Sequence, residues 1–113
     1  MTQRDVAKLL NARFLEASED YDREAVNFCG ADMMSEALAF SHENTTLLTG
    51  LCNQQVIRTA EMLDVHAIIF VRGKQPTPEM LEMAKEKDIV VMSTCETMYN
   101  ACGKIYHATH KGE

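Results

Sequence analysis

Three turns between residues 49 and 97 carry the residues best suited to hold a ligand. Arg72 and Lys74 could hold the charge of an anionic metabolite or nucleotide, and the hydroxyls of Ser93 and Thr94 could donate hydrogen bonds to it. Asp32, at the start of an apolar segment, could contact a ligand or a metal together with Ser35. The three turns are Thr49-Gly50 with Asn53, Arg72-Gly73-Lys74, and Ser93-Thr94 with Thr97.

Ordinary turn and cap chemistry accounts for the same residues. Gly50 and Gly73 supply permissive backbone dihedrals, which tight turns need whether or not a ligand binds. Thr94 is placed to cap the last helix, and Asp32 to cap the helix that follows it. Both interpretations of the three turns therefore remain open.

Each turn follows an apolar run and precedes a segment with helical spacing. Apolar runs without alternation indicate strands that are buried on both faces, as in a parallel sheet with right-handed crossovers. In such sheets ligands bind beyond the carboxyl ends of the strands, where the turns would converge. The sequence predicts a single α/β domain with a mostly parallel sheet and helices on both faces, a Rossmann-like three-layer arrangement. The predicted strands are 45–48, 67–71 and 89–92, and the predicted helices are 53–63, 78–87 and 96–106.

The first half of the chain is less regular. Thr2 is a suitable N-cap for a short helix that ends at Asn11, and Phe14 to Ala17 reads as a strand before an acidic loop. Residues 26–29 indicate another strand, and a helix follows Asp32. The last residues, 108–113, show no pattern and are predicted to be a frayed tail.

Composition and charge exclude several functions. A length of 113 residues suits one core, and 46% hydrophobic residues argue against disorder. Lys and Arg total 11 against 17 Asp and Glu, a net charge of −6, so nucleic acid is not an expected partner. No segment is apolar enough to cross a membrane or resembles a signal peptide, which predicts a cytoplasmic protein without a membrane partner.

No motif in the sequence specifies a catalytic residue, a metal or a cofactor, and none is predicted. The four cysteines form no C-x-x-C pair and are read as free, partly buried thiols. A nucleophilic Cys95 or Cys102 would need a base, and only His107 is near in sequence. His107 and His110, with Glu113, would make a surface metal site only if the final helix continued; a solvated tail is the simpler interpretation. The methionines are read as core filling rather than an adaptable binding face.

Several stretches, in this order, resemble the DRTGG domain family. Residues 30–36 (GADMMSE) are similar to a segment of short stand-alone members from anaerobic bacteria. LLTG at 47–50, AIIFVRGKQP at 67–76 and IVVMST at 89–94, with Thr97 beyond, match the family's strands and their Thr/Gly turns. The resemblance covers nearly the whole chain.

The resemblance implies an α/β domain that is commonly dimeric. Such domains occur alone or attached to CBS domains, phosphotransacetylases and certain pyrophosphatases, and are related to the non-catalytic N-terminal domain of HPr kinase. No G-x-x-x-x-G-K-[ST] phosphate loop is present, so kinase activity is not expected. Val71, Arg72 and Gly73 replace the family's Thr-Gly-Gly, so no threonine contact is carried over to this chain.

Two functions follow from the sequence and the resemblance. The first is a non-catalytic regulatory or scaffolding module, a homodimer that binds a small anionic metabolite, a nucleotide or a partner enzyme. The alternative is a small thiol- or phosphate-dependent enzyme that uses the same strand-end pocket. The absence of an acid/base pair and of a metal motif from the sequence favours the first.

Overall fold

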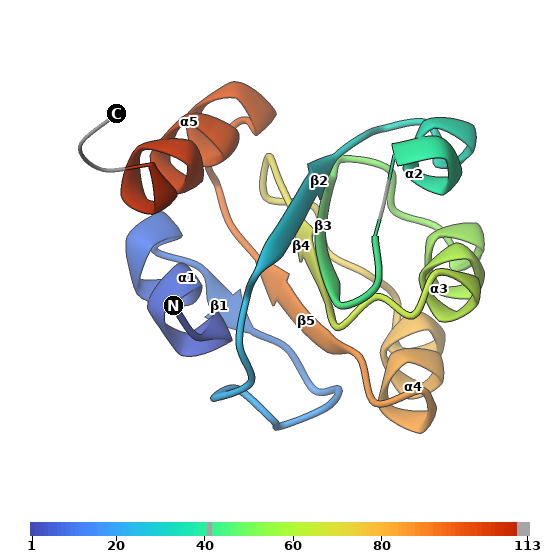
Figure 1. Ribbon diagram of the computed structural model, residues 1–113. Coiled ribbons are helices and arrows are strands. Elements are labelled where there is room, and N and C mark those ends of the chain that lie inside the picture. Colours follow the sequence, from blue (N-terminus) through green and yellow to red (C-terminus); the bar gives the residue numbers. More distant parts are fainter. Residues whose placement is uncertain (41, 111–113) are drawn as a thin grey trace.

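Four strands run parallel and form the body of the sheet (Figure 1). The computed structural model describes residues 1–40 and 42–110, and within them a fifth strand pairs antiparallel at the edge, giving the order β1-β5-β4-β3-β2. The mostly parallel sheet predicted from the sequence is therefore confirmed. The strands are β1 (Arg13–Phe14), β2 (Asn27–Gly30), β3 (Thr45–Thr49), β4 (Ala67–Phe70) and β5 (Val90–Ser93).

Helices cover both faces of the sheet and complete the three layers (Figure 1). One layer holds α1 (Gln3–Leu10) and α5 (Met98–Thr109), which contact each other. The opposite layer holds α2 (Met34–Phe40), α3 (Gln54–Met62) and α4 (Pro78–Glu86), side by side. None of the helices in the described ranges is long and apolar enough to cross a membrane.

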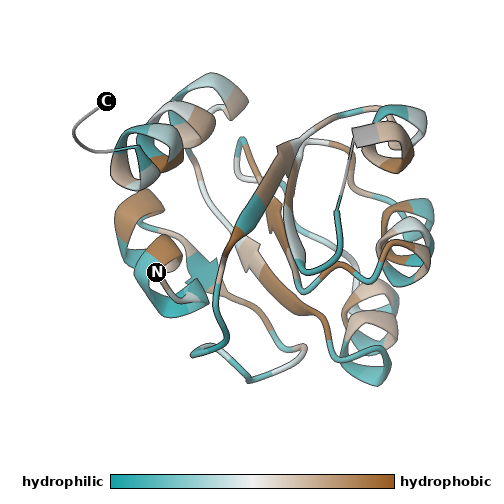
Figure 2. Cartoon of the chain, in the orientation of Figure 1, coloured by the Kyte–Doolittle hydropathy of each residue, from teal (hydrophilic) through white to brown (hydrophobic). Residues whose placement is uncertain are grey.

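The core lies on both faces of the central strands, which are the most apolar part of the chain in Figure 2. In β4 the side chains of Ala67 and Ile69 join the cluster under α1 and α5, while Ile68 and Phe70 join the cluster under the other three helices. This alternation follows from the pleat of a strand. Because both sides are buried, the strand shows no alternation of polar and apolar residues in the sequence.

Side-chain caps fix where most of the helices begin. Thr2 forms a capping box with Asp5, as expected for an N-cap, and Pro78 lies in the first turn of α4. The expectation that Thr94 caps the last helix is wrong: the Thr97 hydroxyl accepts the Asn100 N–H at 3.2 Å. Accordingly, α5 begins at Met98 rather than at residue 96.

Two predicted segments differ in the structure. The strand expected over residues 14–17 ends at Phe14, because the Ala17 N–H turns back to the Leu15 carbonyl at 2.9 Å. The predicted tail begins too early: α5 continues through Thr109, whose hydroxyl donates to the Ile105 carbonyl. Residues 111–113 of that prediction lie outside the described residues.

Arg23 ties the long loop between β1 and β2 to the opposite end of the sheet from the three turns. Its Nη1 donates to the main-chain carbonyls of His66, at 3.2 Å, and of Asp88, at 2.8 Å. Its Nη2 lies 3.0 Å from the Asp88 carboxylate. The Arg23 side chain is only 11% exposed, so one residue holds the loop against the start of β4 and β5.

Candidate functional site

The three turns that follow β3, β4 and β5 meet at one end of the sheet, beyond the carboxyl ends of these strands. The Val71 N–H donates to the Thr49 carbonyl at 3.0 Å, which joins the first turn to the second. The Gly73 N–H donates to the Thr94 carbonyl at 2.8 Å, which joins the second to the third. The main chain around residue 72 is thus held from both sides.

Arg72 adopts a left-handed backbone conformation, with φ of 58°. The other non-glycine residues with positive φ in the described ranges are all Asn or Asp, which tolerate this region well. A long side chain held in that conformation is unusual, and such outliers gather at functional sites. Gly73 follows with φ of 69°, so the turn is left-handed at two consecutive residues.

Gly50 leaves the space that the Arg72 guanidinium occupies. A Cβ atom added to Gly50 would lie 1.8 Å from Nη2 of Arg72, well inside any contact distance. The glycine therefore allows the guanidinium to approach the backbone of the neighbouring turn closely. The sequence had suggested that Gly50 is needed for its permissive backbone dihedrals. Its φ is not in the left-handed region, so the space for the Arg72 side chain is the reason for the glycine.

Asp32 joins this pair from the segment between β2 and α2. Its Oδ1 accepts the Gly50 N–H at 2.7 Å, and its Oδ2 lies 3.8 Å from Nη2 of Arg72. The helix-cap interpretation of Asp32 is wrong, because its carboxylate accepts the N–H of Gly50, directly after β3, while the Glu36 and Ala37 N–H groups of α2 donate to the Met33 carbonyl. Ser35 lies inside α2 and is exposed.

The hydroxyl groups near the turns serve the fold. Ser93 Oγ donates to the Lys74 carbonyl at 2.9 Å, and Thr94 Oγ1 donates to the Leu10 carbonyl at 2.8 Å. Thr49 Oγ1 accepts a main-chain N–H within its own turn. All three side chains are buried. The expectation that Ser93 and Thr94 donate to a ligand is therefore not met in this structure, because carbonyl groups of the chain already take both protons.

Lys74 lies near the far end of the first turn. Burial raises the pKa of the Cys52 thiol, and the positive charge of Lys74 opposes that shift. Asn53, the next residue, accepts the Val56 N–H at 3.3 Å and caps α3.

Cys52 and Cys102 do not have the environment of a nucleophilic thiol. Burial raises the pKa of Cys102 as it does that of Cys52, whereas a nucleophilic thiol needs a lowered pKa. Cys95 is exposed, and its Sγ would lie 3.9 Å from a Cβ on Gly73. The structure places no cluster of three His, Cys, Asp or Glu side chains suited to a metal within residues 1–40 and 42–110.

The arrangement suits an anion that also carries a hydrogen-bond donor. The Arg72 side chain is 44% exposed, and its guanidinium hydrogen-bonds to no other side chain in the described part of the protein. Its N–H groups can therefore donate to phosphate or carboxylate oxygens, while Asp32 can accept from a hydroxyl or amino group. Sequence reasoning placed Arg72 and Asp32 in the site but gave no sign that they face each other over Gly50.

A mostly parallel sheet with helices on both faces, and an exposed arginine and aspartate beside a glycine turn, define a small α/β domain. The sequence model of the DRTGG domain matches residues 5–108, and the chain belongs to the DRTGG domain family. No curated protein sequence matches the chain.

Among solved structures, the fold is shared over most of the chain by a regulatory region with two kinds of domain. It is the regulatory region of a Clostridium perfringens pyrophosphatase, with CBS and DRTGG domains, in complex with the activator diadenosine tetraphosphate. The TM-score is 0.78 and the sequence identity is 21%, over 92% of this chain and 45% of that one. This chain therefore spans less than half of that regulatory region.

Proposed function

We propose that this DRTGG domain is a non-catalytic regulatory module that binds a small anionic ligand, such as a nucleotide or phosphorylated metabolite, and acts on a partner enzyme. The observation that carries the proposal is Arg72, held in a left-handed conformation with its guanidinium over Gly50 and 3.8 Å from Asp32. The net charge of −6 would repel an anion from the rest of the surface, so a local cation with free donors is required. The cytoplasmic location expected from the sequence stays a prediction.

The regulatory region of the pyrophosphatase supports the choice of ligand class. Part of that region, 45% of its chain, shares the fold, and the region is complexed with a nucleotide activator. By analogy, we propose that this chain binds a nucleotide or a similar anion and passes the signal to an enzyme. A homodimer is part of the proposal, since the exposed apolar residues described below would be covered by a second copy.

Replacing Arg72 by Ala should weaken binding of such an anion by about 1.5–3 kcal/mol, the usual scale for a hydrogen bond to a charged group. The ligand is first sought by a thermal-shift screen of nucleotides and phosphorylated metabolites, because a ligand that binds only the native state raises the melting temperature. Calorimetry then compares the affinity of the wild type and the variant. The fold should stay nearly as stable, since the position is an exposed turn.

Two further variants make this test specific. Arg58→Ala removes an exposed arginine from α3, where its guanidinium donates to the Gln54 side chain, and should leave affinity unchanged. Gly50→Ala keeps the charge but places a methyl group where the guanidinium lies, and should weaken binding as Arg72→Ala does. An Arg72→Ala protein that binds the ligand as tightly as the wild type would show that these turns are not the site.

A further inference from the structure

Gly103 lies in the interior of α5, and nothing in the isolated chain requires a glycine at this position. A Cβ atom added there would meet nothing within 4 Å. Glycine inside a helix lowers its stability by about 1 kcal/mol relative to alanine. Neither the packing of this chain nor a turn explains the residue, so the position is open to a contact from outside the chain.

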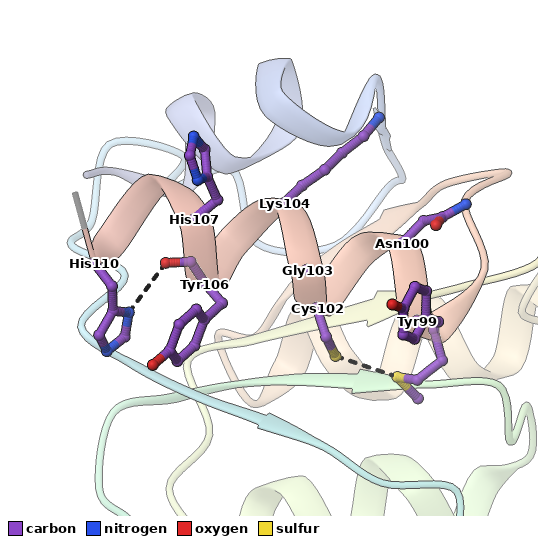
Figure 3. Close-up of a pocket in the computed structure, with 9 residues that line it drawn as sticks. Tyr99, Asn100, Cys102, Gly103, Lys104, Tyr106, His107 and His110 are labelled. Atoms are coloured by element: carbon purple, nitrogen blue, oxygen red, sulfur yellow. Dashed lines mark hydrogen bonds between the residues drawn. The ribbon is translucent and has the colours of Figure 1, made fainter. Parts of the chain in front are cut away.

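Two exposed tyrosines flank this position on the same face of α5. Tyr99 is 87% exposed and Tyr106 is 63% exposed. Tyr99 lies three residues before Cys102, and Tyr106 lies three residues after Gly103. The two tyrosines therefore project about 10 Å apart along the helix. The small residues Cys102 and Gly103 form a notch between them. Figure 3 shows Tyr99, Cys102 and Tyr106 projecting from one side of α5, with Lys104 and His107 on the other.

Hollows over α5 and along β2 join into one surface. The first, of about 930 Å³, is lined by Tyr99, Gly103 and Tyr106 among others. The second, of about 500 Å³, runs between α5 and the edge strand β2 and shares Cys102, Tyr106 and His110 with the first. Val26, beside that edge, is also exposed. The apolar surface therefore extends beyond one helix onto the open edge of the sheet.

The charge of this surface favours a second copy of the chain as its partner. The chain carries 17 acidic residues, yet α5 has none. Lys104 is paired with Glu96 at 2.8 Å, so its charge is already balanced within the chain. Two copies that meet through α5 avoid the repulsion expected between other parts of an acidic surface.

We infer that two chains associate through α5, packed antiparallel across a two-fold axis between Cys102 and Gly103. This inference rests on the homodimer of the proposed function and names its interface. Because the tyrosines are equally distant from that axis, Tyr99 of each chain faces Tyr106 of the other, and the small residues let the helices approach at the centre. Such an interface is isologous and closed, so it stops at a dimer.

Charge substitutions at the tyrosines test both the surface and the register. Tyr99→Lys and Tyr106→Asp should each raise the dimer dissociation constant at least about tenfold, as expected for the loss of an aromatic residue from an interface. The double variant Tyr99→Lys/Tyr106→Asp should recover much of the association, because each lysine then faces an aspartate of the other chain. Met62→Lys is the matched control, since Met62 is 75% exposed but lies on the opposite layer.

Sedimentation equilibrium over about 1–100 µM covers the range in which a moderately stable dimer dissociates. The inference is overturned if the wild type keeps its monomer mass of 12.7 kDa throughout, or if the single variants stay as dimeric as the wild type. In the second case the homodimer stands but uses another surface. Loss of association without recovery in the double variant would refute the antiparallel register. Ligand binding through Arg72 is measured separately, so its outcome does not depend on this test.

Discussion

Phe70→Ala should lower the free energy of unfolding by about 3–5 kcal/mol, because the ring is fully buried and its removal leaves a cavity in a close-packed core. Phe70 ends the central strand β4 and belongs to the cluster under α2, α3 and α4. A single domain has a total stability of about 5–15 kcal/mol, so this loss is a large share of it. Urea unfolding followed by circular dichroism at one fixed protein concentration measures it.

Phe14→Ala is the matched control for Phe70→Ala. Phe14 lies in the edge strand β1, is half-buried, and stacks on Tyr21 with ring centroids 3.8 Å apart. Its loss should cost about 1–2 kcal/mol, since part of the ring is already in contact with water. Equal losses for the two variants would contradict the placement of Phe70 at the centre of the core.

Arg23→Met should lower the free energy of unfolding by about 2–4 kcal/mol, because it leaves the carbonyls of His66 and Asp88 without a charged donor. Methionine keeps the aliphatic stem, so packing changes little. Arg4→Met is the control: Arg4 pairs with Asp22 of the same loop but is about half exposed. Surface pairs of this kind contribute about 1 kcal/mol or less. If both variants lost the same amount, Arg23 would not be the residue that holds the loop.

The Arg23 contacts also predict a dependence on pH. The Ser18 hydroxyl, and to a lesser degree Arg23, hold the pKa of Asp88 below its ordinary value of 3.8. A carboxyl group with a lowered pKa in the folded state stabilises it above the ordinary pKa, and this contribution is lost as pH falls through the folded pKa. The difference in stability between wild type and Arg23→Met should therefore be smaller in acid than at neutral pH. A difference that grew on acidification would contradict the contact.

The layers of the fold were predictable because burial leaves a direct trace in the sequence. Residues 67–71 are apolar without a break, and only a strand covered on both faces requires that pattern. The caps were predictable where one candidate was present, as at Thr2. Thr94 and Thr97 both precede α5, and the local pattern does not reveal that Thr94 is buried against the carbonyl of Leu10.

The candidate site was predictable in its location but not in its contacts. The strand ends identified the three turns, since parallel strands bring their carboxyl ends together. The contact of Asp32 with Gly50 joins residues 18 positions apart, and an acid before a helix is equally consistent with a cap. The α5 surface could not be predicted from the apolar stripe of the helix, because that stripe marks only the face that packs against the sheet. Its signal is a glycine inside a helix, midway between two tyrosines.

The short segment Gly30–Asp32 connects the two proposed sites, the α5 surface and the anion site at Arg72. At one end a Cβ on Gly30 would lie 2.9 Å from Sγ of Cys102, under the α5 surface; at the other, Asp32 bonds to Gly50 beside Arg72. Any ligand that binds the dimer more tightly than the monomer must strengthen dimerisation by the same factor, because coupling between two binding equilibria is reciprocal. The affinity for an anion would then rise with the concentration of the protein itself. The fraction of this domain with bound ligand would therefore depend on the amount of the protein as well as on the amount of the ligand.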